Sequence, residues 1–300
     1  MSPDRWRIVP DVGLDPAAVE RIDTLSKRHG HAVWRLVTAE RSYVLKWLGR
    51  GSARVEIESY QLLRRLGVPT LPLYGSSAGA LLLEDLERSP AWRLAGEADL
   101  GRAEVGRAVA HWYRVFHDAG QALLTQGPRP DFLTRESDVL DPETVIGTGR
   151  ALHLSRFSVW ELAADHVELL KAAVERLSLT LNYNDFHWTN LALSSPQGEE
   201  LEVLVFDYHL LGMGMRYSDV RNVVGSLSGG APGAFRDAYG AIDPLEETLD
   251  RPLATLHNLA MAARMAELPK WARASRERVV RGDLERDLLE AILLAWALLG

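Results

Sequence analysis

The 300-residue sequence contains no cysteine. Disulfide bridges, thiolate zinc sites and a cysteine nucleophile are therefore excluded. The amino-terminal segment MSPDRWRIVPDVGLDP also lacks the apolar stretch of a secretion signal. Both absences are typical of a protein that works inside the cell, and we expect a cytoplasmic protein.

Long apolar runs are missing as well. No stretch reaches the roughly 18 residues that a membrane-spanning helix needs, and the apolar segment DLLEAILLAWALLG is too short. We interpret this segment as a packing helix. The net charge of −7 argues against a nucleic-acid surface and against a polybasic membrane patch. We therefore predict neither nucleic acid nor a membrane as a partner.

The composition that remains is that of an ordinary globular protein. Hydrophobic residues make up 47% and charged residues 25% of the chain, which is long enough for one large domain or two modest ones. The first 90 residues mix helices with short strands. We expect a helix at 15–27 with Asp15 as its N-cap, a hairpin turning at Glu40-Arg41, a helix at 53–67 that Gly67 ends, and strands in TLPLYG and GALLLEDL.

Helices dominate from about residue 97, apart from one strand-rich island at 179–207. The composition changes near ERSPAWR at 87–93, so we divide the chain into domains at 1–87 and 88–300. The expected helices are 99–119, 141–152, 157–177, 231–240, 251–267, 270–280 and 283–299. The tryptophans at helical positions are expected in the core: Trp112, Trp160, Trp271 and Trp296.

Polar residues gather in LNYNDFHWTN, between two apolar, strand-like segments. Asp185 and Asn190 stand five apart there, and the apolar run LEVLVF places a second carboxylate, Asp207, at its end. Two carboxylates and an amide oxygen suit Mg²⁺, which prefers oxygen ligands and usually binds few protein groups besides substrate phosphates. The alternative interpretation is a turn in which Asp185 and Asn190 hydrogen-bond their own loop.

A phosphoryl-transfer site needs further parts, and the sequence has a candidate for each. Lys46 lies inside the apolar strand SYVLKWL, where a charge is costly unless it is paired. The next helix supplies two carboxylates, Glu56 and Glu58. The segment ALLLEDLE fits a strand whose backbone groups would meet the edge of an adenine.

Six segments, taken in order, resemble the aminoglycoside phosphotransferase-like family of small-molecule kinases, which are relatives of the protein kinases. They are VLK (44–46), ESYQLLRRLGVPTLPLYG (58–75), LLLEDL (81–86), YNDFHWTN (183–190), VFDYH (205–209) and SDVRNVVGSL (218–227). The resemblance implies an α+β, protein-kinase-like two-lobe fold, with a small β-rich nucleotide-binding lobe and a larger, mostly helical lobe. It also implies Mg²⁺-dependent transfer of the γ-phosphoryl group of ATP or GTP to a hydroxyl group of a small metabolite or antibiotic.

The resemblance also implies roles for single residues in the transfer. Asp185 would accept or orient the hydroxyl proton, and Asn190 and Asp207 would bind Mg²⁺. Lys46 would contact the α- and β-phosphates. Glu58 would hold Lys46, because Glu58 stands four residues before a leucine, as the family's glutamate does.

The remaining implied roles are structural or concern binding. Backbone groups from Glu84 to Leu86 would take the adenine. Tyr183 and Asp219 would support the catalytic loop, although Asp219 also has the position of an ordinary helix N-cap. His187 and Trp188 are candidates for the acceptor pocket.

The chain departs from the family pattern at four places. Tyr183-Asn184 replaces His-Gly, and His209 takes a usually acidic position. The Gly-Asp-Pro before the supporting aspartate is lost, and the phosphate loop RHGHAVW offers only Gly30. These departures leave an alternative open, which is a catalytically inactive kinase-like module that binds nucleotide or a partner.

Overall fold

The computed structural model describes residues 5–28, 30–194 and 200–300, and it forms two compact units. The sheet unit comprises residues up to 119, 183–211 and 222–240. The helical unit comprises residues 120–182, 212–221 and 241–300. This division follows packing and does not test the division into domains at 1–87 and 88–300, which stays a prediction.

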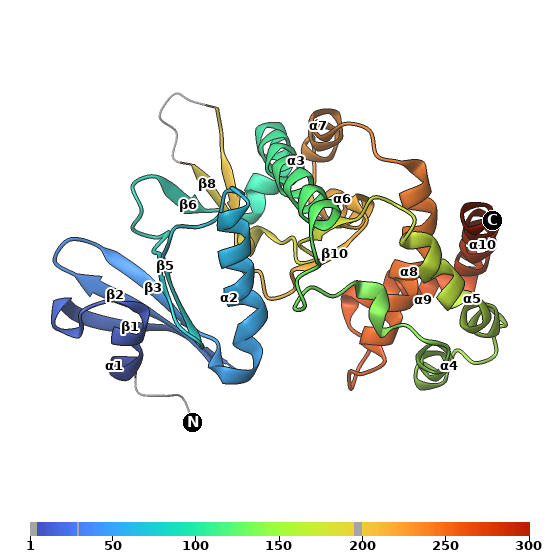
Figure 1. Ribbon diagram of the computed structural model, residues 1–300, viewed down its shortest axis with the longest axis horizontal. Helices are drawn as coiled ribbons and strands as arrows, with labels where there is room; N and C mark the ends of the chain where they lie inside the picture. The colour runs from blue at the N-terminus through green and yellow to red at the C-terminus, as the bar shows by residue number, and fades with distance from the viewer. Residues whose placement is uncertain (1–4, 29, 195–199) are drawn as a thin grey trace. The chain divides into compact units, whose positions relative to one another are not determined.

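A five-stranded antiparallel sheet is the largest part of the sheet unit (Figure 1). Its spatial order is β1-β2-β3-β5-β4. The hairpin turning at Glu40-Arg41 and the two strands that follow the first long helix are confirmed. The strands are β1 (Val19–Arg28), β2 (His31–Thr38), β3 (Ser42–Trp47), β4 (Leu73–Ser76) and β5 (Ala80–Glu84).

The two faces of this sheet differ because side chains alternate along each strand. One face packs into an apolar core with α1 (Arg5–Ile8) and the turn η1 (Pro10–Val12), and Trp34, Leu36 and Leu45 lie fully buried in it. The opposite face carries two basic residues, Arg35 and Lys46, among its apolar side chains: Val33, Val44 and Leu83.

The predicted helix at 15–27 is wrong. Asp15 does cap a short turn, η2 (Pro16–Ala18), by accepting from Ala17 N, but strand β1 begins at Val19. Strand β1 pairs with β2 from Val19 opposite Thr38 to Arg28 opposite His31. Because helix propensity is a weak preference, the ladder of tertiary hydrogen bonds outweighs the helical spacing of the apolar residues.

Helix α2 (Gly49–Arg65) is confirmed, and its chain reverses at Gly67 with φ +72°. Its buried positions include Glu56, Ser59, Tyr60 and Leu63, which recur at helical spacing on one side. This side contributes both apolar and polar groups to the region beneath the sheet.

The rest of the sheet unit surrounds a cluster of aromatic side chains. The first part of α3 (Ala103–Gln126) contributes Trp112 and Phe116, whose rings stack 5.0 Å apart. The other elements are β6 (Trp92–Leu94), η3 (Glu97–Gly101), η5 (Trp188–Asn190), β8 (Leu191–Ser194), β9 (Val203–Val205) and α7 (Ala231–Tyr239), and strands β6, β8 and β9 form a three-stranded sheet.

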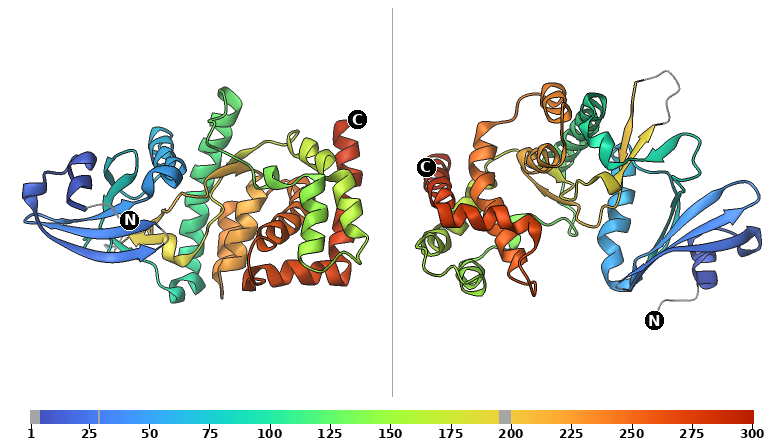
Figure 2. Two further views of the ribbon diagram at one scale, coloured as in Figure 1. Left: turned by 90° about the horizontal axis from the view of Figure 1, so that it is seen from below. Right: turned by 180° about the vertical axis from the view of Figure 1, so that it is seen from behind.

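The helical unit has its own apolar core. Helix α10 (Asp283–Leu299) packs against α5 (Val159–Val174) and α8 (Pro244–Ala262), as the further views in Figure 2 show. The other elements are η4 (Glu136–Val139), α4 (Pro142–Ala151), β7 (Thr180–Asn182), β10 (Gly212–Gly214), α6 (Arg216–Ser226, shared with the sheet unit), η6 (Lys270–Ala272) and α9 (Arg273–Arg281).

The expectation for the helical tryptophans is only partly correct. Trp112 and Trp160 are buried, whereas Trp271 and Trp296 are more than half exposed. Trp296 shares the outer face of α10 with Leu289 and Leu293, which are also exposed. Helical spacing therefore identified amphipathic helices without saying which apolar side chains find a partner.

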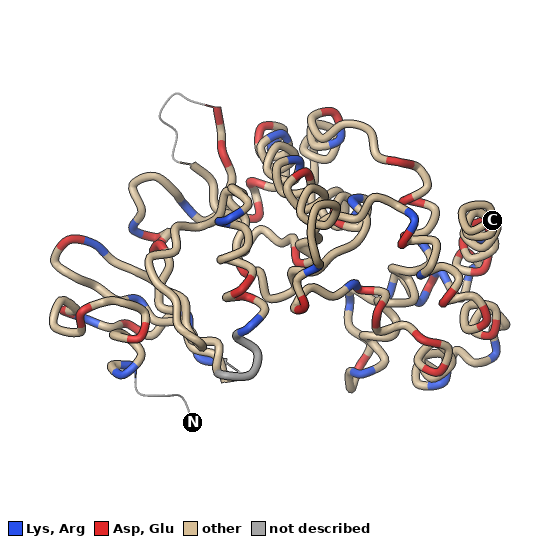
Figure 3. The backbone as a smooth tube through the Cα atoms, viewed as in Figure 1, with Lys and Arg blue, Asp and Glu red and all other residues tan. Residues whose placement is uncertain are grey.

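Basic and acidic residues are both spread over each of the two units (Figure 3). Among residues 5–28, 30–194 and 200–300, no helix is both long enough and apolar enough to cross a membrane. The predicted cytoplasmic location stays a prediction.

Candidate active site

The polar stretch between β7 and β8 folds as a loop that returns on itself. Asn184 has φ +64°, a left-handed conformation that asparagine tolerates better than other residues with a side chain. Asparagine can therefore stand where the related family has glycine. After this reversal, Asn190 ends the turn η5, and its backbone N–H donates to His187 O at 2.9 Å.

The three residues predicted for catalysis and metal binding share this loop and the end of β9. Asn190 Nδ2 donates to Asp185 Oδ2 at 2.9 Å and to the Asp185 carbonyl at 3.2 Å. The backbone N–H of Phe206 donates to Asn190 O at 3.1 Å, which brings the chain just before Asp207 beside the loop. Asp207 itself has φ +67°. The alternative of a simple capped turn describes the contact of Asp185 with Asn190 but not the neighbouring carboxylate.

The two carboxylates differ in their affinity for protons. Burial raises the pKa of Asp185 above its ordinary value, although the nearby His209 acts against this rise. Burial also disfavours the charged form of Asp207, but hydrogen bonds from His209 and Lys46 outweigh burial and lower its pKa. Asp185 is therefore the better proton acceptor, and Asp207 remains an anion across the neutral range.

Lys46 lies between two carboxylates. Their negative charges compensate the free-energy cost of a charged side chain inside an apolar strand. Its Nζ donates to Glu56 Oε1 at 2.7 Å and to Asp207 Oδ1 at 2.9 Å. The second contact joins residues that are 161 positions apart in the chain, so it connects strand β3 with the segment that follows β9. Burial lowers the pKa of Lys46, but its two anionic partners outweigh burial and raise it.

The prediction that Glu58 holds Lys46 is wrong, because Glu56 occupies that place. Glu58 accepts from Arg54 Nε at 2.7 Å on the outer side of α2, whereas the side chain of Glu56 is only 1% exposed. Residues two apart on a helix point in nearly opposite directions, so only one of the pair can face the sheet. Tyr60 and Leu63 lie on the same side of α2 as Glu56. Their apolar character could have indicated from the sequence that Glu56, and not Glu58, faces the sheet.

A slot of about 230 Å³ opens between the face of the sheet that carries Lys46 and the side of α2 that carries Glu56. Glu84 and Leu86, predicted to offer backbone groups to adenine, both line it. Most of its walls are apolar, as in other small-molecule sites. Its lining residues include Leu25, Val33, Val44, Leu71, Leu83, Leu94 and Phe206 together with Asp85, Glu87 and Asp207.

Tyr183 is fully buried and reaches the end of β9. Its hydroxyl donates to the Phe206 carbonyl at 2.5 Å, and its ring contacts those of Tyr208 and Trp112 edge-on, at 5.8 and 6.4 Å between centroids. An aromatic donor in this position can thus hold the loop against the segment that carries Asp207. His209 Nδ1 lies 2.8 Å from Asp207 Oδ1.

The two acceptor-pocket candidates lie at the surface of the loop. His187 is exposed, and its Nδ1 accepts from the backbone N–H of Thr189 at 3.3 Å, which caps the turn η5. Trp188 is half-buried, and its ring lies 5.4 Å from that of His187. No contact of theirs tests a role in acceptor binding, which stays a prediction.

Asp219 belongs to the helical unit and lies inside α6, so its interpretation as a helix N-cap is wrong. It is fully buried, and Asn182 Nδ2 donates to its Oδ2 at 3.5 Å. Asn182 directly precedes the loop of Tyr183 and Asp185, and it also donates to the Met215 carbonyl at 2.9 Å. Asp219 therefore anchors the strand that leads into the loop.

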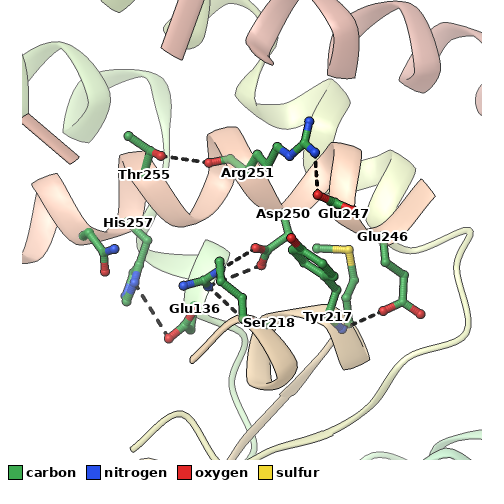
Figure 4. A network of polar contacts seen from close by, with 12 residues as sticks. Glu136, Tyr217, Ser218, Glu246, Glu247, Asp250, Arg251, Thr255 and His257 are labelled. Atoms are coloured by element: carbon green, nitrogen blue, oxygen red, sulfur yellow. Dashed lines mark hydrogen bonds and ion pairs between the residues drawn. The ribbon is translucent and has the colours of Figure 1, made fainter. Parts of the chain in front are cut away.

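A second polar cluster surrounds Glu136 in the helical unit, between α6 and α8 (Figure 4). His257 Nδ1 lies 3.9 Å from Glu136, and Arg221 Nε donates to Asp250 Oδ2 at 2.6 Å. Burial raises the pKa of Glu136 to about 7 despite Arg221 nearby. A small cavity of about 40 Å³ adjoins this cluster, and sequence reasoning did not single out any of these residues.

Comparison with known proteins decides the family. The model of the phosphotransferase enzyme family matches residues 22–252, most of the chain. The chain belongs to the phosphotransferase enzyme family. No curated protein matches the sequence of this phosphotransferase.

Solved structures show the same fold at low sequence identity. A choline/ethanolamine kinase family protein from Mesorhizobium loti has a TM-score of 0.58 at 12% identity, over 96% of this chain and 98% of that chain. A macrolide 2′-phosphotransferase from Brachybacterium faecium has 0.52 at 16% identity, over 89% and 92%. A spectinomycin phosphotransferase, in complex with ADP and spectinomycin, has 0.52 at 10% identity, over 97% and 96%. The predicted α+β, protein-kinase-like fold is confirmed, and the match to the family model makes the chain a phosphotransferase.

Magnesium is implied by the family, and the side chains of this phosphotransferase fit it. Within the described residues, no three His, Asp or Glu side chains gather as a self-sufficient metal site. Mg²⁺ commonly binds one or two carboxylates and completes its octahedron with phosphates and water. The oxygen atoms of Asn190 and Asp207 match that donor set.

Two residues that line the slot were not assigned a role from the sequence. Glu56 ranked behind Glu58 as the partner of Lys46, and Arg35 was not among the candidate residues. The signal for Arg35 was the one that identified Lys46, a charged residue inside an apolar strand, HAVWRLVT.

Proposed function

We propose that this protein is a Mg²⁺-dependent small-molecule kinase that transfers the γ-phosphoryl group of ATP or GTP to a hydroxyl group. The observation that carries the proposal is the contact of Lys46 with Asp207, beside the hydrogen-bonded pair of Asp185 and Asn190. The half-buried Lys46 and the Asp207 carboxylate thus meet at the slot, and Asp185, the proposed proton acceptor, lies in the loop beside Asp207. Phosphoryl transfer requires this combination, because its catalysis is mostly positioning and neutralisation of charge.

The proposed step uses the side chains as follows. The acceptor oxygen attacks the γ-phosphorus, its proton passes to the Asp185 carboxylate, and the bond to the β,γ-bridging oxygen breaks. The raised pKa of Asp185 favours proton acceptance. Lys46 stabilises the negative charge of the phosphates. Mg²⁺, held by Asn190 and Asp207, would neutralise the charge that develops on the leaving group.

The nucleotide would lie in the slot with its base between the apolar side chains. Backbone groups from Glu84 to Leu86, which line the slot, would hydrogen-bond the edge of the base. Tyr183 and Asp219 would hold the catalytic loop in place, through the Phe206 carbonyl and through Asn182. His187 and Trp188 would contribute to the acceptor pocket.

The acceptor is a small hydroxylated molecule, as in the relatives, whose names include ethanolamine, spectinomycin and macrolides. The carboxyl-terminal residues 241–300 contain ten acidic and eight basic residues, a mild net charge of −2. This does not favour a polycationic aminoglycoside over a sugar, an amino alcohol or a nucleoside. We therefore propose the acceptor class no more narrowly.

The test is nucleotide turnover with ATP and GTP across a panel of sugars, amino alcohols, nucleosides and aminoglycosides. The Asp185→Asn variant should lower kcat by about 10²–10⁴-fold, the usual contribution of general base catalysis. Asp237→Asn, which changes an exposed aspartate of α7, is the control and should retain full activity. Undiminished turnover in Asp185→Asn would remove Asp185 from the mechanism.

The predicted alternative, an inactive nucleotide-binding module, is not favoured, because Asn184 suits its left-handed backbone and Tyr183 is well packed. Calorimetric titration with ATP separates the two possibilities. A kinase should bind ATP more tightly when Mg²⁺ is present. Binding that ignores Mg²⁺, combined with no turnover of any acceptor, would support the inactive module.

A further inference from the structure

The end of the slot away from Lys46 holds a second ion cluster, which we call the Arg35 clamp: Arg35, Ser42, Asp85 and Glu87. The Asp85 side chain is buried in it, whereas that of Glu87 is 61% exposed. Arg35 Nε donates to Asp85 Oδ2 at 2.6 Å, and Arg35 Nη2 donates to Asp85 Oδ1 at 3.1 Å and to Glu87 Oε2 at 2.5 Å. Ser42 Oγ donates to Asp85 Oδ2 at 2.7 Å. Both carboxylate oxygens of Asp85 are therefore engaged.

The clamp begins at the residue where the pairing of β3 with β5 ends. The ladder between β3 and β5 ends with Tyr43 opposite Glu84, so Asp85 is the first residue beyond it. From there the chain turns, with Arg88 N donating to Asp85 O at 3.0 Å. The segment from Asp85 to Glu87 thus lines the slot without strand pairing, and side chains from β2 and β3 hold it instead.

Stability alone does not explain this cluster. The Asp85 side chain is 2% exposed and that of Arg35 is 11% exposed, and a buried ion pair loses much of its attraction to the removal of water from both charges. What a bidentate arginine–carboxylate pair supplies is fixed geometry. The fixed object here is a stretch of backbone that borders a ligand slot.

We propose that Arg35 is a positioning residue for the nucleotide base: through Asp85 and Glu87 it holds the backbone that would hydrogen-bond the base. This inference rests on the proposed kinase function and adds a residue to it. Arg35 shares the sheet face with Lys46, but in β2 it pairs with Val44, whereas Lys46 pairs with Val33. Arg35 therefore acts at the base end of the slot, and Lys46 at the phosphate end.

The proposal predicts that base binding and phosphate binding are separable by mutation. Loss of Arg35 should weaken ligands that contain the base and spare those that contain only phosphates. A general loss of folding would weaken both kinds of ligand. The distinguishing probes are adenosine, which lacks phosphates, and Mg²⁺-tripolyphosphate, which lacks the base.

The experiment is calorimetric titration of four proteins with adenosine, with Mg²⁺-tripolyphosphate and with Mg²⁺ plus a non-hydrolysable ATP analogue. The proteins are the wild type, Arg35→Met, Arg35→Lys and the control Arg21→Met, which removes an exposed arginine paired with Asp23 on β1. Arg35→Met should bind adenosine and the ATP analogue about tenfold more weakly and tripolyphosphate equally well. Arg35→Lys should recover part of the loss, and Arg21→Met should match the wild type.

Three outcomes would overturn the inference. They are unchanged adenosine binding in Arg35→Met, an equal loss for both probes, and a loss in Arg35→Lys as large as in Arg35→Met. A thermal unfolding curve checks that each variant is folded, and Arg35→Lys keeps the test open where Arg35→Met does not fold. If the wild type itself binds no nucleotide, the proposed kinase function fails, which is a different result from a failure of Arg35.

Discussion

Lys46 and Arg35 are two basic residues on one face of the sheet, at opposite ends of the same slot. Their positive charges are compensated by carboxylates in different ways. Lys46 is held by two carboxylates from distant parts of the chain, Glu56 and Asp207. Arg35 is held by Asp85 and Glu87 from one short segment. The first arrangement gathers reactive groups, and the second fixes a piece of backbone.

The pKa values of two buried carboxylates, Glu56 at the one end and Asp85 at the other, shift in opposite directions. Burial raises the pKa of Glu56, and the attraction of Lys46 only partly offsets this rise. Burial acts on Asp85 too, but hydrogen bonds from Arg35 and Ser42 outweigh it and lower the pKa. The charged form of Glu56 is thus disfavoured by its surroundings, whereas that of Asp85 is favoured.

Hydrogen bonding supports the same contrast. At the Glu56 end, two buried atoms, Glu56 Oε2 and the Tyr60 hydroxyl, have no hydrogen-bond partner among the described residues. Both side chains line the slot. Buried polar atoms without partners are costly and are found where a site awaits water or ligand. The comparison shows that the Lys46 end contains buried polar atoms without partners, which is what we expect where the proposed phosphate site trades stability for function.

The largest effect is expected from Lys46→Met. Removing the cation from the phosphate end should lower kcat by about 10²–10³-fold, the usual loss for one preorganised electrostatic group. Steady-state kinetics measure it, with Lys27→Met on the exposed part of β1 as the control. A variant that keeps its kcat and only raises KM would erase the distinction between the two ends.

The next effect concerns stability at the base end. Asp85→Asn should destabilise the protein by about 2 kcal/mol at pH 7, because Arg35 loses its main buried partner. Since the folded protein lowers the pKa of Asp85, this contribution is present above the ordinary value of 3.8 and disappears as pH falls through the folded pKa. Urea unfolding at pH 7 and at the lowest pH that preserves folding should show the difference from wild type shrinking. A difference that does not depend on pH would contradict the ionic origin.

Glu56→Gln should affect activity and stability in opposite ways. Turnover should fall about tenfold, because Lys46 loses one of the two groups that orient it. Because burial raises the pKa of Glu56 above 4.5, its contribution to stability is full below that value and is lost as pH rises through the folded pKa. The variant, which mimics the protonated form, should therefore not be less stable than wild type at pH 8. Glu58→Gln is the matched control and should change neither property; equal losses in both variants would restore Glu58 as the partner.

The smallest effect is expected from Tyr60→Phe. Removing a buried hydroxyl that has no hydrogen-bond partner in the described part of the chain should stabilise the protein by about 0.5–1 kcal/mol. Thermal unfolding measures this change, and Tyr74→Phe, which removes a hydroxyl that donates to Glu84 at 2.6 Å, should destabilise instead. A loss of stability in Tyr60→Phe would show that the hydroxyl is satisfied, by water, in the free protein.

Several candidate site residues could be recognised from short segments of the sequence. Asp185 and Asn190 lie in one loop, Asp207 follows an apolar strand, and Lys46 lies inside another, and each pattern is visible within about ten residues. Most helices beyond residue 97 were also visible, because helical periodicity is a local property. However, α8 begins at Pro244 and not at 251, and α6 was not among the predicted helices. The catalytic and metal-binding roles of the site residues stay predictions.

The failures share the opposite property. Strand β1 looked like a helix until its pairing with β2 was known, and Trp296 looked like a core residue until the packing of α10 left it exposed. Which of Glu56 and Glu58 meets Lys46 depends on the rotation of α2 against the sheet. Contacts such as Arg35 with Asp85 join residues 50 positions apart, and their free energy appears only after the chain has folded. Residue types and short spacings thus determined which side chains are candidates for the site, and long-range packing determined which of its charges meet, because local patterns do not encode the orientation of one element against another.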